Sequence, residues 1–163
     1  MPASEIVDVV DSDDIVIGTA TREECHRNSS LFHRCTHFTL YDRQHDQVLL
    51  TKRPLNKEGD AGKFMFAGEH VVTGETYKTA LQRGVKEEFG FLPTTWQLIG
   101  KAFFQYDTQS EFAQMYLVDW HNEPLRWNQN DFETIRWVSK NSADLQSFAL
   151  GHITQFWVEK ICA

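Results

Sequence analysis

The segment EHVVTGETYKTALQRGVKEEFGF, residues 69–91, is the most informative stretch of this sequence. Gly74-Glu75 predicts a tight turn that opens a helix, and Gly90 is typical of the residue that closes one. Between them, residues spaced three or four apart lie on one helix face. The segment therefore predicts a loop, a turn and a helix that directs acidic side chains toward one place.

Two adjacent carboxylates, Glu87 and Glu88, are the candidate metal ligands of this helix. Mg2+ prefers oxygen ligands and is commonly bound by one or two carboxylates together with substrate phosphates. A bound cation would also relieve the repulsion between neighbouring carboxylates. The alternative is a solvated helix face on which Glu87 pairs with Arg83, four residues earlier. We favour the metal site, with Glu88 as the first ligand and Glu87 as the second.

The same segment resembles the Nudix box. That pattern is Gly, five residues, Glu, seven residues, Arg-Glu, an apolar residue, any residue, Glu-Glu, any residue, Gly and an apolar residue. The matching positions are Glu75, Arg83, Val85, Glu87, Glu88, Gly90 and Phe91. Two positions depart: Glu69 stands where the leading Gly is expected, and Gly84 replaces the first Glu after the Arg. Because the second departure removes a carboxylate that binds metal or activates water in many family members, the resemblance implies the fold more firmly than the activity.

Residues 5–91 also resemble isopentenyl diphosphate isomerase, a Nudix-fold enzyme whose divalent-metal site is built from histidines and glutamates. The resemblance puts His26, His33 and His70 at its metal histidines and Glu88 at its magnesium-associated glutamate. Imidazole ligands favour Mn2+ or Zn2+ over Mg2+. The chain has seven histidines, so chance is the alternative explanation of this spacing. The three-histidine site therefore stays beside the carboxylate site as a second metal hypothesis.

The resemblance also implies a substrate site. Arg53 and Lys57 fall where the isomerase grips its diphosphate, and two basic side chains suit a diphosphate on electrostatic grounds as well. The alternative is a solvated basic pair. Gly68 occupies the place of the isomerase's catalytic cysteine, and Glu111 is the one member that remains of its later acidic pair. The frame of the isomerase site is thus retained, but part of its acid–base chemistry is missing.

Four charged residues are further candidates for the same site. Glu69, next to His70, is an additional metal ligand at the mouth of the helix. Glu111 and Glu133, on later segments, are candidate general bases. Lys63 adds a weaker cation from the loop that carries Lys57.

Alternation of apolar residues and turn signals predict the remaining elements. The predicted strands are residues 5–10, 15–20, 32–41, 47–53, 64–72, 96–106, 112–120 and 132–138, and the predicted helices are residues 21–27, 142–148, 152–161 and the one that ends at Gly90. This order favours an α/β fold, an α/β/α sandwich with a mixed sheet, and the Nudix resemblance implies the same arrangement.

The bulk properties are those of one globular domain over residues 1–163, with 41% hydrophobic and 24% charged residues. A net charge of −7 argues against nucleic-acid binding by charge alone. The sequence shows neither a signal peptide nor an apolar run of the roughly 20 residues that a membrane span needs. Three cysteines without metal-pair spacing indicate reduced thiols. We therefore expect a cytoplasmic protein without membrane or nucleic-acid partners, with a homodimer left open.

Three functions follow from these residues. The first is a hydrolase of the isomerase-like Nudix subgroup, which would cleave a diphosphate-containing small molecule with Mg2+ or Mn2+. The second is isopentenyl diphosphate isomerase activity itself. The third is a non-catalytic sensor of a phosphorylated ligand, marked by Gly84, in which Gly84→Glu would create or raise activity.

Overall fold

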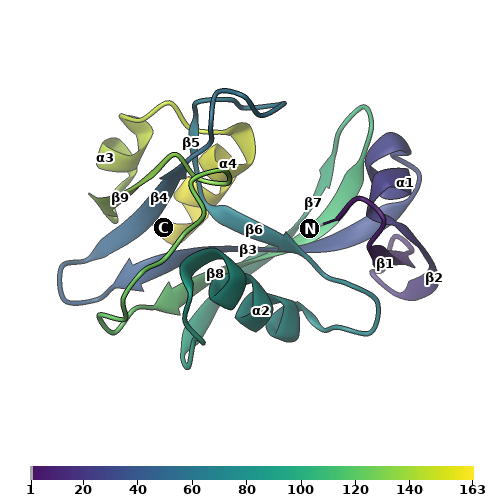
Figure 1. The fold of residues 1–163 in the computed structure, drawn as a ribbon, viewed down its shortest axis with the longest axis horizontal. Helices are drawn as coiled ribbons and strands as arrows, with labels where there is room; N and C mark the ends of the chain where they lie inside the picture. Colours follow the sequence, from purple (N-terminus) through teal and green to yellow (C-terminus); the bar gives the residue numbers. More distant parts are fainter. Residues whose placement is uncertain (1) are drawn as a thin grey trace.

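The computed structural model describes residues 2–163, which form a large sheet with helices on both sides (Figure 1). In chain order the elements are β1 (Ile6–Val10), β2 (Val16–Thr21), α1 (Arg22–Arg27), β3 (Phe32–Asp42), β4 (Gln47–Lys52), β5 (Phe64–Met65), β6 (Ala67–His70), α2 (Tyr77–Phe89), β7 (Trp96–Gln105), β8 (Ser110–Asp119), β9 (Thr134–Ser139), α3 (Ser142–Gln146) and α4 (His152–Ile161). No helix within the described range has the length and apolar character needed to cross a bilayer.

Strand β3 organises the sheet. It pairs antiparallel with β1, β4 and β6 and parallel with β8. The hairpin partner β2 extends the sheet beyond β1, and β9 pairs antiparallel with β4. The sheet is therefore mixed, as the sequence predicts.

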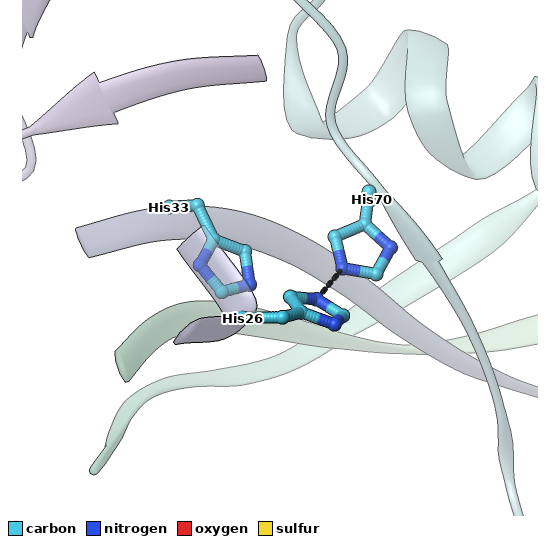
Figure 2. A group of neighbouring side chains, drawn as sticks. All are labelled: His26, His33 and His70. Atoms are coloured by element: carbon cyan, nitrogen blue, oxygen red, sulfur yellow. Dashed lines mark hydrogen bonds between the residues drawn. The ribbon is translucent and has the colours of Figure 1, made fainter. Parts of the chain in front are cut away.

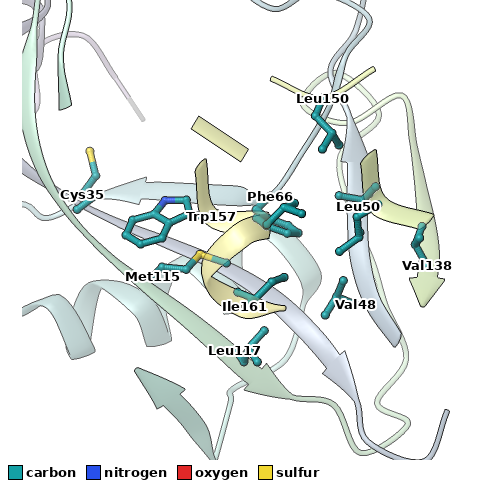
Figure 3. Close-up of a cluster of buried hydrophobic side chains, with 13 residues drawn as sticks. Cys35, Val48, Leu50, Phe66, Met115, Leu117, Val138, Leu150, Trp157 and Ile161 are labelled. Carbon is teal, nitrogen blue, oxygen red and sulfur yellow. The ribbon is translucent and has the colours of Figure 1, made fainter. Parts of the chain in front are cut away.

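Alternation along β3 sends its side chains to two different cores. Cys35 joins the cluster on the side of α3 and α4, which also contains Val48, Leu50, Phe66, Met115, Leu117, Val138, Leu150, Trp157 and Ile161 (Figure 3). Phe38 and Leu40 face the other side, where they pack against the helix α2 through Leu81, Val85 and Phe89. Since each face carries its own helices, the expected α/β/α sandwich is confirmed.

Local sequence signals fix the ends of the helices. Thr21 caps α1 and forms a reciprocal capping box with Glu24, as its spacing predicts. Gly90 ends α2 in the left-handed conformation, with φ of 85°, and donates its N–H to the carbonyl of Lys86. The helix begins one residue later than the Gly74-Glu75 turn suggests, because Thr76 is its N-cap.

Tyr77 packs against the edge of the core under α2 and also has a polar partner. Its ring is half-buried, and its hydroxyl donates to the carboxylate of Asp14 at 2.8 Å. Asp14 also accepts from Arg34 Nε at 2.6 Å and from Lys101 Nζ. This buried carboxylate therefore ties the β1–β2 turn to β3, α2 and β7, close to the end of the sheet that carries the histidines.

Candidate active site

A cavity of about 520 Å3 collects five of the predicted site residues: Arg53, Lys57, Glu69, His70 and Glu88. Pockets of 300–1,000 Å3 are typical of small-molecule sites. The lining comprises Arg22, His37, Arg53, Lys57, Met65, Phe66, Ala67, Gly68, Glu69, His70, Glu88, Asp131, Phe132, Ile153, Thr154 and Trp157. The cavity thus joins the strands β5 and β6, the end of α2, the loop after β4 and the helix α4.

Glu88 is the box glutamate that borders the cavity. Burial raises its pKa to about 7, and the charges of Asp131, Glu69 and Glu87 add to the shift. Such crowding of carboxylates costs free energy that a bound cation would offset. Glu69 is also buried, and burial raises its pKa against the opposing effect of Arg83. This donor set of carboxylate oxygens fits a hard divalent cation.

Glu87 lies on the outer side of this group. Its side chain is 55% exposed and lies 3.4 Å from Arg83 Nη1, and it is not among the cavity residues. Arg83 binds Glu75 with two hydrogen bonds, of 2.9 and 3.0 Å, and donates to the carbonyl of His70 at 2.7 Å. Arg83 therefore holds the turn before α2 against β6 and orients Glu75 of the box. Glu87 also forms the ion pair with Arg83 that is expected of a solvated helix face.

The two predicted phosphate-binding residues, Arg53 and Lys57, both line the cavity. Arg53 donates through Nε and Nη2 to the carbonyls of Gly59 and Glu58, so its guanidinium also closes its own loop. Lys63, the weaker third candidate, pairs with Asp60 at 3.0 Å and does not line the cavity.

The three predicted histidines come together beside the cavity. His26 from α1, His33 from β3 and His70 from β6 point toward one another (Figure 2), and their nearest ring nitrogens all lie within 4.8 Å. The Nε2 atoms of His26 and His70 are 2.8 Å apart. Burial lowers the pKa of His26 to about 4, with the charge of His33 adding to the effect, and it lowers that of His70 well below its usual range. Both imidazoles are therefore neutral, as metal ligands must be.

His33 contributes buried ring nitrogens without a hydrogen-bond partner in the described chain. Its side chain is fully buried. Its Nε2 lies 3.5 Å from Glu111 Oε2, in register across the parallel strands β3 and β8. Buried polar atoms almost always have partners, so the three imidazoles and Glu111 fit a transition-metal ion.

Glu111 is buried among groups that hold its charge. Burial alone would raise its pKa, but the imidazoles of His33 and His37 outweigh this and keep the pKa well below its usual range. Cys35 donates its S–H to Oε2 at 3.1 Å, and His37 Nε2 lies 3.3 Å from Oε1. The other nitrogen of His37 accepts a hydrogen bond of 2.8 Å from Trp157 Nε1, so His37 donates through Nε2 to the carboxylate.

A model of the NUDIX domain matches residues 32–155. The chain belongs to the Nudix family. A Haemophilus influenzae 8-oxo-dGTP diphosphatase is 34% identical over 63% of this chain and 73% of its own length. An uncharacterised Nudix hydrolase of Nostoc is 31% identical over 83% of this chain and 86% of its own.

Two further comparisons bear on the subgroup and on the fold. An isopentenyl-diphosphate isomerase of Haloarcula marismortui is 27% identical over 83% of this chain and 77% of its own length. A crystal structure of a Deinococcus radiodurans protein superposes with a TM-score of 0.78 at 23% identity, covering 97% of this chain and 99% of that one. The Nudix fold predicted from the box is thereby confirmed.

The cavity lining includes residues that the sequence does not mark as site residues. Among them are His37, Asp131 and Trp157, which belong to no motif. Gly68, which pairs with His37 across β3 and β6, is the residue that could have indicated a place for His37 at the cavity. A Cβ at Gly68 would lie 3.1 Å from His37 Cδ2, so the histidine ring occupies the space that a side chain at position 68 would take.

Proposed function

We propose that this protein is a hydrolase that cleaves a diphosphate-containing small molecule with the help of Mg2+ or Mn2+. Membership of the Nudix family supports hydrolysis, and members of this family generally use divalent metals. The observation that carries the proposal is that Glu88 lines the same 520 Å3 cavity as Arg53 and Lys57. One cavity therefore offers a carboxylate for a cation and two cationic side chains for the phosphate oxygens of the same small molecule.

Each residue has a defined part in this proposal. Glu88 holds the cation, assisted by Glu87 from the preceding position of α2. Arg53 and Lys57 bind the diphosphate oxygens. When bound, the cation supplies Lewis-acid activation of the phosphoryl group and of the attacking water. Glu133 is a poor general base, because it is exposed, lies 3.5 Å from Lys52 and is not a cavity residue.

The organic part of the substrate is best sought among nucleosides. Phe132 lines the cavity and is only partly buried, so it offers an aromatic surface on which a base can stack. One relative is named for cleavage of 8-oxo-dGTP, and a Shewanella oneidensis Nudix domain of similar fold was crystallised with ADP-ribose. A nucleoside diphosphate derivative is therefore the first substrate class to test.

The test is a hydrolysis screen of nucleoside and non-nucleoside diphosphates with Mg2+ and with Mn2+, in which release of phosphate or nucleotide is measured. We expect turnover that is lost in Glu88→Gln and weakened mainly through KM in Lys57→Ala. Glu159→Gln, which changes an exposed carboxylate outside the cavity, is the matched control. Binding of the metal without turnover of any compound would sink the hydrolase proposal.

A second candidate rests on the histidine cluster. The grouping of His26, His33 and His70 with Glu111 supports an isomerase-like metal centre, which Mn2+ or Zn2+ would suit. Gly68, however, provides no acid or base at the position of the isomerase's cysteine. We therefore expect no exchange of solvent deuterium into isopentenyl diphosphate, and exchange at enzymatic rates would favour the isomerase over the hydrolase.

A further inference from the structure

Gly84 is a buried glycine in the middle of α2, and a specific side chain occupies the space beside it. A Cβ built at this position would lie 3.0 Å from Glu69 Cβ and 3.4 Å from Glu69 Cγ. It would also lie 3.1 Å from Phe38 Cε1. Because glycine costs a helix interior about 1 kcal/mol relative to alanine, this close approach is a physical reason for keeping it.

The space above Gly84 belongs to the face of α2 that bears the acidic residues. Position 84 lies one helical turn before Glu88, so a side chain there would lie on the same face as Glu88. Glu69 reaches this space from β6, is 7% exposed and lines the cavity together with Glu88. Its Oε1 accepts from the N–H of His70 at 3.0 Å and lies 3.6 Å from Arg83 Nη1, so the carboxylate is held in place from two sides.

We propose that Glu69 and Gly84 are an exchanged pair. Glu69 supplies from β6 the metal-binding carboxylate that α2 lacks at position 84, and Gly84 provides the room in which that carboxylate stands. Glu69 and Glu88, which both line the cavity, then form the main oxygen ligands of the site, with Glu87 assisting from outside the cavity. The inference rests on the proposed metal-dependent function, but it adds the origin of one ligand and explains both departures from the Nudix box as a single change.

The pair predicts how substitutions combine. If Gly84 marked a lost catalytic group, Gly84→Glu would raise activity. Shared space predicts the opposite, because a side chain at position 84 would collide with Glu69 and Phe38. The double variant Glu69→Gly/Gly84→Glu removes the contact with Glu69, leaves the one with Phe38, and keeps one carboxylate in the space.

The first measurement is Mg2+ binding to the full-length protein by isothermal titration calorimetry. Mg2+ is chosen because it selects oxygen ligands over the imidazoles of the histidine cluster. We expect Glu69→Gln to weaken binding about tenfold or more, since a carboxylate ligand loses its charge. The exchange variant Glu69→Gly/Gly84→Glu should restore the affinity to within a few-fold of the wild type, and Gly84→Glu alone should not tighten it.

The second measurement does not involve metal. Gly84→Ala is compared in the wild type and in Glu69→Gly by urea unfolding with EDTA present. In Glu69→Gly the contact with Phe38 remains, so helix propensity should raise the folding equilibrium constant by less than about fivefold, whereas in the wild type the added contact with Glu69 should cancel or reverse the gain. Gly18→Ala is the control, because a Cβ there meets nothing within 4 Å and its effect should not depend on Glu69.

The outcomes separate this inference from the proposed function. If the wild type binds Mg2+ and Glu69→Gln binds it equally well, the exchange is overturned while the metal-dependent function stands. If the wild type binds no Mg2+, both the function and the ligand role of Glu69 are overturned. If Gly84→Ala changes stability equally with and without the Glu69 side chain, the claim that Glu69 fills the space beside position 84 is overturned.

Discussion

Replacing Glu88 by glutamine should make the metal-free protein more stable, even though the residue is central to the proposed site. Burial and three neighbouring carboxylates raise the pKa of Glu88 from 4.5 to about 7. At about 1.36 kcal/mol per pKa unit, this difference amounts to about 3 kcal/mol between the protonation states. Because Glu88 is partly open to the solvent of the cavity, we expect about 2 kcal/mol of it to be measurable.

The pH dependence fixes the sign of the effect. Between the unfolded pKa of 4.5 and the folded pKa of about 7, the folded protein binds more protons at Glu88 than the unfolded chain does. The wild type therefore loses stability as pH rises through this window. Glutamine does not ionise, so Glu88→Gln should match the wild type near pH 4.5 and exceed it by about 2 kcal/mol at pH 8.

The assay is urea unfolding in EDTA at several pH values from 4.5 to 8.5. The matched control is Glu87→Gln, at the preceding position of the helix. The half-exposed ion pair of Glu87 with Arg83 should contribute no more than about 0.5 kcal/mol to the free energy of unfolding. Saturating Mg2+ should make the wild type more stable than Glu88→Gln, because only the wild type has the Glu88 carboxylate to bind the cation. A difference between Glu88→Gln and the wild type that does not change with pH, or a less stable variant at pH 8, would refute the reasoning.

Three further outcomes are expected. Asp14→Asn should destabilise the protein by about 2–4 kcal/mol in urea, because Arg34 and its other buried donors lose their anion. Burial would raise the pKa of Asp14, but hydrogen bonds from Lys101, Arg34 and Tyr77 outweigh it and lower the pKa. This contribution is therefore present above about pH 4 and fades as the pH falls further, and a loss of stability that does not shrink at all as the pH falls below about 4 would contradict it. Gly90→Ala should raise the unfolding rate or lower the stability by about 1 kcal/mol, because φ is 85°. Trp157→Phe should weaken Mn2+ binding at the histidine cluster about tenfold by freeing His37, as calorimetry can measure, and unchanged affinity would exclude this orienting role.

The sequence predicts those parts of the molecule that local patterns control. The capping box of Thr21 and Glu24 and the stop at Gly90 depend on a few neighbouring residues, and both appear where they are expected. Glu88 lies on the cavity because helix periodicity decides which side of α2 it faces.

Contacts between distant segments are not available from such patterns. Trp157 donates to His37 from a helix near the other end of the chain, and no spacing rule links the two residues. Asp131 reaches the cavity from a loop whose path depends on the packed fold. The structural role of Gly84 likewise depends on its neighbours in the fold. The sequence alone does not tell whether this glycine faces solvent or the side chain of Glu69.

The parallel pairing of β3 with β8 has a consequence for how the protein reaches its native state. Phe32 pairs with Ser110 and Tyr41 with Asp119, so this ladder closes a long stretch of chain that includes α2. Non-local pairings of this kind slow folding, because the entropy of loop closure must be overcome before their contacts form. His33 and Glu111 are opposite each other in that ladder, so Glu111 joins the three histidines only when this pairing forms. A metal ion held by His33 and Glu111 would report on the formation of this pairing and would hold the two strands together once they meet.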